Sequence, residues 1–242
     1  MRVTEKTVAI MILALSAWSI FMWAATRFQG NEPNRILRVE LGSDAASLDR
    51  AVQPNDSADK DGIVRNIQMV VRNTDMDLVL NLLYWLTFLA LALLAGRLGE
   101  RVLAVCSALL ISGAALCDLF ENGAILTAMR VQPFTDTAAA DIAEFSQWKW
   151  FLFFLAALFL GLASAMNHHV SAMRRLAGGL FIACGVFGLL GIARYRVALD
   201  FAMSMINVAH LLLVPALLLT LWKIYFSLKE LDHSKHASHG HA

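Results

Sequence analysis

The chain has 242 residues, of which 58% are hydrophobic and 16% are charged. Soluble domains carry about 25% charged residues, so this composition excludes an ordinary soluble protein and indicates an integral membrane protein. The formal net charge of +1 gives no sign of a nucleic-acid partner or of a polybasic lipid anchor. The one partner that composition predicts is the lipid bilayer.

Six apolar runs are long enough to cross a bilayer, because a span needs roughly 20 mostly apolar residues. They cover residues 8–25, 78–95, 102–129, 150–166, 176–193 and 203–226. We therefore predict an all-α integral membrane protein, a six-helix transmembrane bundle with a structured extracytoplasmic segment after the first helix. Its parts are an N-terminal signal-anchor helix (1–26), the extracytoplasmic segment (27–76), a five-helix membrane bundle (77–227) and a cytoplasmic His-rich tail (228–242).

The Lys and Arg residues of the short loops predict the orientation, since cytoplasmic loops carry an excess of them. With the N-terminus inside, the inner pieces hold eight such residues and the short outer loops hold three. Both termini are therefore expected in the cytoplasm, and the protein in the inner (cytoplasmic) membrane. The first span is expected to be retained, because its apolar core of about 18 residues exceeds the ~7–15 of a signal peptide.

The extracytoplasmic segment contains three expected elements. Residues 36–41 have the composition of a strand, and Ser43 and Asp44 are positioned to cap a short helix that ends at Val52. Residues 53–62 are expected to form a polar loop. Apolar residues then recur at helical spacing over 63–71, which predicts an amphipathic helix on the outer surface before the second span, either a connector or a lid.

The third span carries the stretch CDLFENGAIL, in which Asp118, Glu121 and Asn122 interrupt an otherwise apolar run. Their i, i+3, i+4 spacing places them on one helix face. At 1.5 Å per residue, Asp118 lies about 24 Å above Val102, in the outer third of a core ~30 Å thick. Such a face cannot point at lipid cheaply, so it is expected to face the bundle interior.

Polar residues of other spans lie at a similar depth. The second span enters from outside with Asp77, Asn81 and Tyr84, the fourth begins beside Lys149, and the sixth carries Asn207 and His210. We predict that these residues form one polar layer near the outer leaflet with Asp118, Glu121 and Asn122. His210 is either a packed, hydrogen-bonded residue or a ligand or base working with the acids.

The charges of this layer leave two interpretations open. Lys149 can neutralise an acid in a structural ion-pair network, with Asn122 bonding between helices. Alternatively, three acids against one base leave a surplus that keeps a proton or binds a cation, which makes Asp118, Glu121 and Asp77 candidate catalytic residues. Asn122, Lys149, His210, Asn207, Asn81 and Tyr84 are then the candidate binding residues. The spacing of ligands gives no metal site here.

Five glycines of the fifth span, Gly178, Gly179, Gly185, Gly188 and Gly191, predict close helix packing. The tail HSKHASHGHA is rich in histidine, and such tracts can bind transition metals. The sequence contains no Walker loop, dinucleotide fingerprint or Cys-x-x-Cys, so the cofactor, if there is one, is unknown.

At Asp118-x-x-Glu121-Asn122 the sequence resembles a group of uncharacterised bacterial multi-span membrane proteins. The likeness extends to Val39-Glu40-Leu41, to the segment from Asp77 to Tyr84, and to Lys149, and covers roughly residues 36–155. The resemblance implies no activity. It implies that the outer polar layer is one unit.

Three functions fit a polar cleft near the outer leaflet. The protein binds or processes a lipid headgroup or lipid-linked substrate, with an acid as proton donor or acceptor. Alternatively, it is a non-catalytic membrane subunit of an envelope complex, with a membrane protein as its partner. A cation- or proton-coupled transporter, with a small cationic ligand, is the third reading, and the apolar inner halves of the spans offer it no second access route.

Overall fold

A computed structural model describes residues 4–28, 35–53, 61–98, 100–131, 133–166, 171–194 and 198–239. Within these ranges the chain forms helices and no strand. The helices are α1 (Glu5–Phe28), α2 (Arg35–Leu41), α3 (Ala45–Val52), α4 (Gly62–Leu98), α5 (Arg101–Ala128), α6 (Asp136–Ala165), α7 (Ala172–Arg194) and α8 (Leu199–His239).

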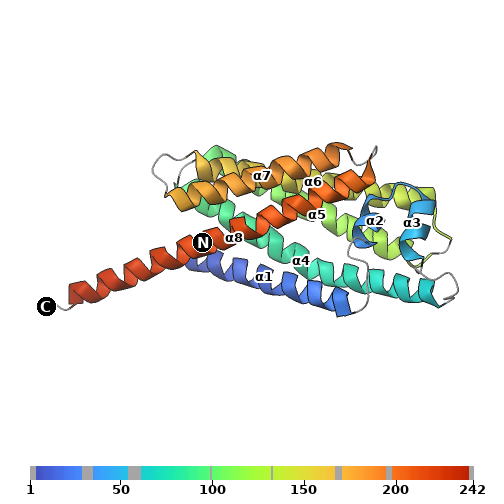
Figure 1. Cartoon of the computed structure of the whole chain (residues 1–242), viewed down its shortest axis with the longest axis horizontal. Coiled ribbons are helices and arrows are strands. Elements are labelled where there is room, and N and C mark those ends of the chain that lie inside the picture. The colour runs from blue at the N-terminus through green and yellow to red at the C-terminus, as the bar shows by residue number, and fades with distance from the viewer. Residues whose placement is uncertain are drawn as a thin grey trace.

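Six of these helices, α1 and α4 to α8, are long and apolar enough to cross a membrane. This confirms the predicted multi-pass, all-α bundle. Figure 1 shows them side by side along one axis, with α1 and α4 on one side of the bundle. The start of α1 and the end of α8 lie at the same end of the bundle, and α2 and α3 lie at the other (Figure 1). The bundle therefore has a terminal end and an α2–α3 end.

The prediction of a strand at 36–41 was wrong, because these residues form the helix α2. A strand would bury alternate residues on one face. Here Leu37, Val39, Glu40 and Leu41 are all buried, and a short helix enclosed by other elements can bury them all. Leu37 and Leu41, one turn apart, join the apolar core of the bundle, whereas Val39 joins a second core.

The second core fixes α2 and α3 to the ends of α4, α5 and α6. It contains Val39, Leu48, Val52, Val70, Ile125, Phe134 and Ile142, among others. The Asp44 side chain accepts a hydrogen bond from the Ser47 backbone N–H and caps α3, which confirms the predicted capped helix. The Ser47 hydroxyl also donates to this carboxyl, and that bond, followed by the backbone bond, lowers the pKa of the exposed Asp44 side chain. A hydrogen bond adds to the apolar contact, because the Asp136 carboxylate accepts one from the Ala45 backbone N–H, 2.9 Å away.

The predicted surface helix at 63–71 is not a separate element. It is the first part of the 37-residue helix α4, which continues without a break through the predicted boundary at residue 76. Its apolar residues Ile63, Ile67 and Val71 pack against the second core. Residues 54–60 of the expected polar loop lie outside the described residues. At the other terminus the predicted tail is helical as far as His239, as a continuation of α8.

Glycines allow α7 to approach α6 closely, as predicted. A Cβ on Gly185 would lie 2.7 Å from both the Phe154 carbonyl oxygen and the Leu158 Cβ, and one on Gly178 would lie 2.9 Å from the Gly161 carbonyl oxygen. Gly179 differs, because a Cβ there would meet no atom within 4 Å. The close approach therefore belongs to one face of α7.

Replacing Gly185 with alanine is expected to destabilise the protein by about 1–3 kcal/mol, because the added methyl meets backbone atoms that cannot move aside alone. Thermal unfolding in detergent measures the loss. Gly179→Ala, on the same helix, is the matched control and should change stability little. Equal behaviour of the two variants would contradict the contact.

Candidate functional site

The polar face of α5 points into the bundle. Asp118, Glu121 and Asn122 are 2%, 0% and 4% exposed, whereas Leu119 and Phe120 between them are 49% and 61% exposed. This is the result of helical periodicity, since residues three and four apart share one face. Leu119 and Phe120 lie on the outward side of the helix, and the polar residues lie on the interior side, as does Ile125 at 1% exposed.

Lys149 of α6 binds the two acids of α5 directly. Its Nζ lies 2.5 Å from Glu121 Oε2 and 3.3 Å from Asp118 Oδ1, and the lysine side chain is buried. Ser146, one turn before Lys149 on α6, donates a hydrogen bond to Glu121 Oε1. Both oxygens of Glu121 therefore have a polar partner on α6, although the residue is fully buried.

A further acid, Glu40 of α2, enters the site from outside the spans. Its Oε1 lies 3.4 Å from Lys149 Nζ, and its Oε2 accepts a hydrogen bond from the Trp150 indole N–H at 3.1 Å. Burial raises the pKa of the Glu40 carboxyl; nearby Lys149 opposes the rise and Asp118 adds to it. Sequence reasoning did not select Glu40 as a site residue, although an acid inside the apolar run ILRVEL was a signal that it is buried.

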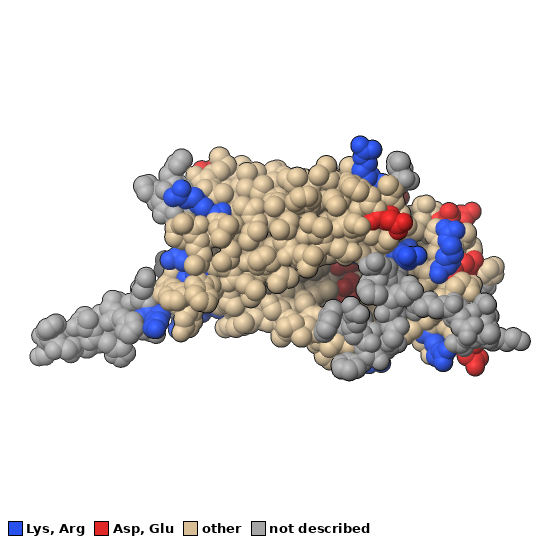
Figure 2. Space-filling view, viewed as in Figure 1, with Lys and Arg blue, Asp and Glu red and all other residues tan. Residues whose placement is uncertain are grey.

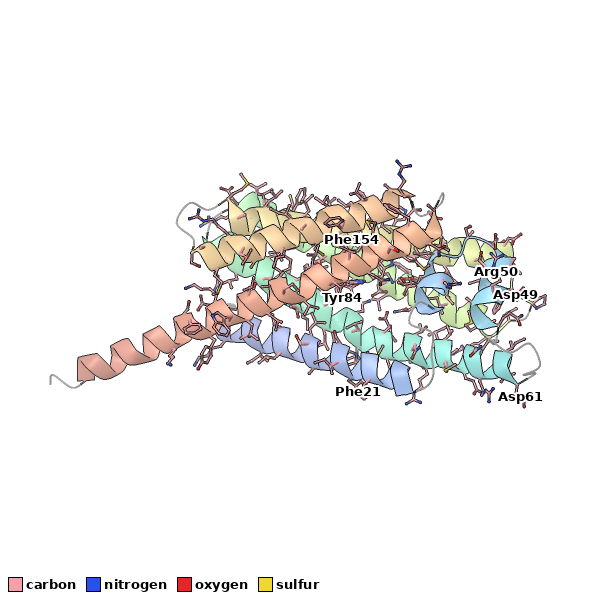
Figure 3. All side chains as sticks on the ribbon, viewed as in Figure 1. Phe21, Asp49, Arg50, Asp61, Tyr84 and Phe154 are labelled. Atoms are coloured by element: carbon pink, nitrogen blue, oxygen red, sulfur yellow. The ribbon has the colours of Figure 1, made fainter. Side chains whose placement is uncertain are left out.

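The predicted polar residues of α4 close the site from the next helix. Tyr84 donates a hydrogen bond from its hydroxyl to Asp118 Oδ2 at 3.1 Å, and Asp77 Oδ2 accepts one from Asn122 Nδ2 at 3.1 Å. Asn81 has a different role, because its amide donates to the Ala115 backbone carbonyl and ties α4 to α5. Figure 3 places Tyr84 on the long helix α4, well away from the charged Asp49 and Arg50 of α3.

We use the name ionic cluster for Glu40, Asp77, Asp118, Glu121 and Lys149. Three helices of the bundle and the short α2 contribute to it, within direct contact distance or through Asn122. Seven of the nine predicted site residues lie in or against this cluster. They are Asp77, Asn81, Tyr84, Asp118, Glu121, Asn122 and Lys149.

His210 lies at the edge of the ionic cluster. Its ring packs against the Trp150 ring, with 5.2 Å between centroids, and the Lys149 Nζ lies 4.7 Å from the centroid of the same Trp150 ring. Trp150 therefore contacts both His210 and Lys149. Trp150 and Ser146 are contact residues that the sequence reasoning missed.

Asn207 is not brought into the ionic cluster. It is exposed on α8, whereas Ile206 and Ala209 on the neighbouring face are fully buried. The structure therefore does not place Asn207 with the other predicted polar residues, and its role as a binding residue stays a prediction. The reason is rotational: the spacing of Asn207 and His210 allows a shared face, but the small and apolar residues of α8 decide which face turns inward.

Comparisons with known proteins add no identity. No family model, no curated protein and no solved structure matches the chain. The resemblance stated from the Asp-x-x-Glu-Asn motif therefore stays a prediction.

The charges of the ionic cluster do not balance. Three carboxyl groups contact the single ammonium group of the cluster, and Asp77 joins them through Asn122, so with every group ionised these five side chains carry three excess negative charges. Lone charges in a low-dielectric interior are costly unless they are paired or neutralised. The described residues of the cluster therefore leave an excess of negative charge, which bound protons or a further cation would offset.

The ionic cluster is closed on one side and partly open on the other. Glu40, Asp118, Glu121 and Lys149 are each at most 7% exposed, whereas Asp77, Tyr84 and His210 are half-buried. Figure 2 shows acidic atoms at the bottom of a hollow in the face of the molecule that α8 crosses. Among the described residues, no group of three His, Cys, Asp or Glu side chains is arranged to hold a metal ion.

Proposed function

We propose that this membrane protein binds the amine of a lipid headgroup, or of a lipid-linked substrate, at the ionic cluster. The observation that carries the proposal is the excess of acids among the described residues of the cluster, three carboxyl groups in contact with one ammonium group and a fourth, that of Asp77, joined through Asn122. An ammonium ion from a ligand would offset part of that excess through charge-assisted hydrogen bonds. An organic cation also needs fewer directed ligands than a metal ion does.

The ligand would approach from the half-buried side of the cluster. Asp77 and Tyr84 lie on this side. One oxygen of the Asp77 carboxylate accepts a hydrogen bond from Asn122, and the second oxygen can accept one from a ligand. The closed contact of Lys149 with its three acids leaves Asp77 as the acid that can meet a ligand first. If the headgroup is also processed, Asp77 is the acid that can exchange a proton with it.

The placement of this site in a cell follows from the loop charges. We infer the cytoplasmic membrane, with both termini inside, because eight Lys and Arg residues lie in the inner pieces and three in the short outer loops. The ionic cluster then faces the outer leaflet. A reporter enzyme that is active only outside the membrane, fused after the last residue, should be inactive in this orientation; an active fusion would reverse it.

The binding proposal is tested by native mass spectrometry of the purified protein with phosphatidylethanolamine. We expect the lipid to be retained, and Asp77→Asn to weaken retention by about ten-fold or more, because asparagine keeps the size of the side chain and its acceptor but loses the charge. Wild type and Asp77→Asn should retain similar amounts of N-acetylated phosphatidylethanolamine, because this lipid lacks the positive charge.

Asp141→Asn is the matched control, because Asp141 is an exposed acid of α6 outside the ionic cluster. It should leave retention unchanged. Equal retention of phosphatidylethanolamine by Asp77→Asn and Asp141→Asn would refute the proposal. It would also be refuted if Asp77→Asn lost the acetylated lipid to the same extent as the unmodified lipid.

A non-catalytic role as a membrane subunit is the second candidate. The observation that favours it is the closed contact of Lys149 with Glu40, Asp118 and Glu121, which fixes α2 to the bundle. In this role the cluster would hold the α2–α3 end in shape for a membrane protein partner. Its test is whether a variant in which neutral amides replace the excess acids keeps both its fold and its function.

A further inference from the structure

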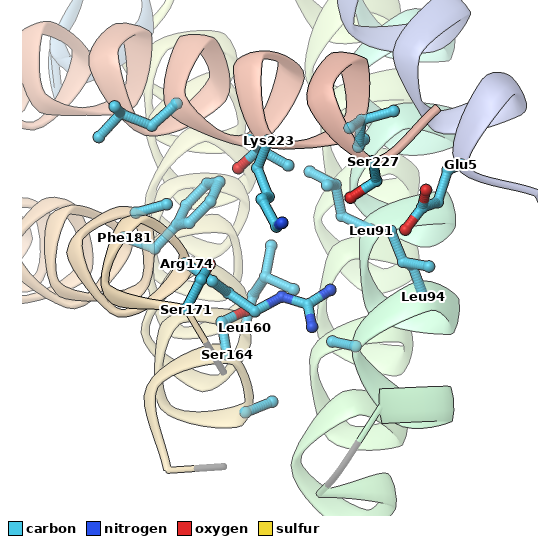
Figure 4. A pocket seen from close by; sticks show the side chains of 16 residues that line it. Glu5, Leu91, Leu94, Leu160, Ser164, Ser171, Arg174, Phe181, Lys223 and Ser227 are labelled. Atoms are coloured by element: carbon cyan, nitrogen blue, oxygen red, sulfur yellow. The ribbon is translucent and has the colours of Figure 1, made fainter. Parts of the chain in front are cut away.

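The terminal end of the bundle contains a cavity of about 350 Å³, far from the ionic cluster. It is lined by residues of α1, α4, α6, α7 and α8 (Figure 4). Glu5 begins α1 and Arg174 lies at the start of α7, so the cavity is near the expected cytoplasmic ends of the spans. Sequence reasoning treated the inner halves of the spans as almost purely apolar and did not foresee it.

Two cations extend into this cavity. Figure 4 shows the Arg174 guanidinium and the Lys223 amine reaching into the space between α7 and α8, with Glu5 across from them. Both cations are half-buried. Within the described residues neither forms a salt bridge, although Glu5 attracts Arg174 electrostatically. The ionised lining therefore carries one excess positive charge.

The rest of the lining combines hydroxyl groups with apolar walls. Ser164, Ser171 and Ser227 supply hydroxyl donors beside the cations. The Thr220 hydroxyl is not among them, because it donates to the Ala216 carbonyl of its own helix. Apolar walls come from residues that are at most 8% exposed, namely Leu91, Leu94, Leu160 and Phe181.

We propose that this cavity binds a phosphate group. A guanidinium presents its donors as a planar fork that matches phosphate oxygens, and a lysine and serine hydroxyls add further donors. The apolar walls suit the chain of a phospholipid, and the volume falls within the range of small-ligand sites. The phosphate comes either from an anionic lipid or from solution. The site is independent of the amine site proposed above.

The test measures phosphatidylglycerol retention by native mass spectrometry of the full chain. The double variant Arg174→Gln, Lys223→Gln is expected to retain about ten-fold less of this lipid than wild type, because both charged donors are lost. Lys229→Gln is the control, since Lys229 is an exposed lysine further along α8. Equal retention by the double variant and Lys229→Gln would rule out a lipid as the source of the phosphate.

A second measurement distinguishes the two sources of phosphate. Inorganic phosphate at millimolar concentration is added to delipidated protein, and its thermal stabilisation is compared with that of an equal concentration of chloride salt. Stabilisation that is lost in the double variant, together with unchanged lipid retention, would assign the site to soluble phosphate. Loss of lipid retention without any effect of inorganic phosphate would assign it to the lipid. Loss of neither would overturn the proposal.

A variant that is expected to bind more lipid keeps the test valid even if the double variant misfolds. Glu5→Gln removes the acid of the lining and should increase phosphatidylglycerol retention about three-fold or more, because it raises the net positive charge of the site. Glu100→Gln, an exposed acid at the same end of the bundle, should not. If Glu5→Gln increases neither phosphatidylglycerol retention nor the stabilisation by inorganic phosphate, the proposal fails even if the double variant does not fold.

Discussion

Replacing Lys149 with methionine is expected to destabilise the protein by about 3–5 kcal/mol, the usual cost of breaking a buried ion pair from one side. Methionine keeps the length of the side chain, so the loss comes from charge and not from a cavity. Without the ammonium group, the carboxyl groups of Glu121, Asp118 and Glu40 lie within a few ångströms of its former position with no positive partner. Equilibrium unfolding in mixed micelles measures the change.

Two comparisons identify the cause of that loss. Lys229→Met removes an exposed lysine of α8 and should have little effect, since exposed charges contribute little. Combining Lys149→Met with Glu121→Gln should recover part of the loss, because the lysine and its nearest acid are removed together. If Lys149→Met lowers stability no more than Lys229→Met does, then Lys149 and its acids do not form the ionised contacts that their geometry indicates.

Helical periodicity was sufficient to predict the part of the site that lies within the spans. Asp118, Glu121 and Asn122 had to share a face, and a face with two acids had to point inward and meet the one lysine available at that depth. Lys149 does so. The same periodicity could not fix the rotation of α8, whose single asparagine is a small fraction of its surface, and Asn207 consequently lies outside.

Glu40 could not be placed from the sequence, because its contact with Lys149 joins residues 109 positions apart. The separation also hid the true form of residues 36–41. A short apolar run with two β-branched residues fits either a strand or a buried helix, and tertiary contacts decide between them. Here two apolar cores and the ionic cluster surround the segment, and a helix satisfies all three.

Removing the excess acids while keeping one ion pair is expected to stabilise the protein at neutral pH. The variant Glu40→Gln, Asp77→Asn, Asp118→Asn keeps the Lys149–Glu121 contact and removes three negative charges from a buried layer. We expect a gain of about 2 kcal/mol or more, because like charges in a low-dielectric site repel one another. The amides preserve the size of each side chain and the acceptors for Trp150, Asn122 and Tyr84.

The pH dependence of the same variant tests the cause. The pKa of Glu40 is raised above its ordinary value of 4.5, mainly by burial, so the folded state binds a proton that the unfolded state lacks between those two values. The stability that this proton contributes is fully present below pH 4.5 and is lost as the pH rises through the raised value. The gain of the variant over wild type should therefore be largest above the raised pKa of Glu40 and shrink on acidification. A constant gain would contradict the assignment.

Amine-lipid retention by this variant separates the two candidate functions. If the variant is more stable but no longer retains phosphatidylethanolamine, the excess acids exist to bind a ligand and reduce stability in doing so, as functional sites commonly do. If it is more stable and retains the lipid as wild type does, the amine-binding proposal fails and the cluster acts through its Lys149 contacts alone, as expected of a non-catalytic subunit. A variant that is less stable than wild type would reject both candidate functions. It would mean that the negative charges of all four acids are already neutralised in the folded protein.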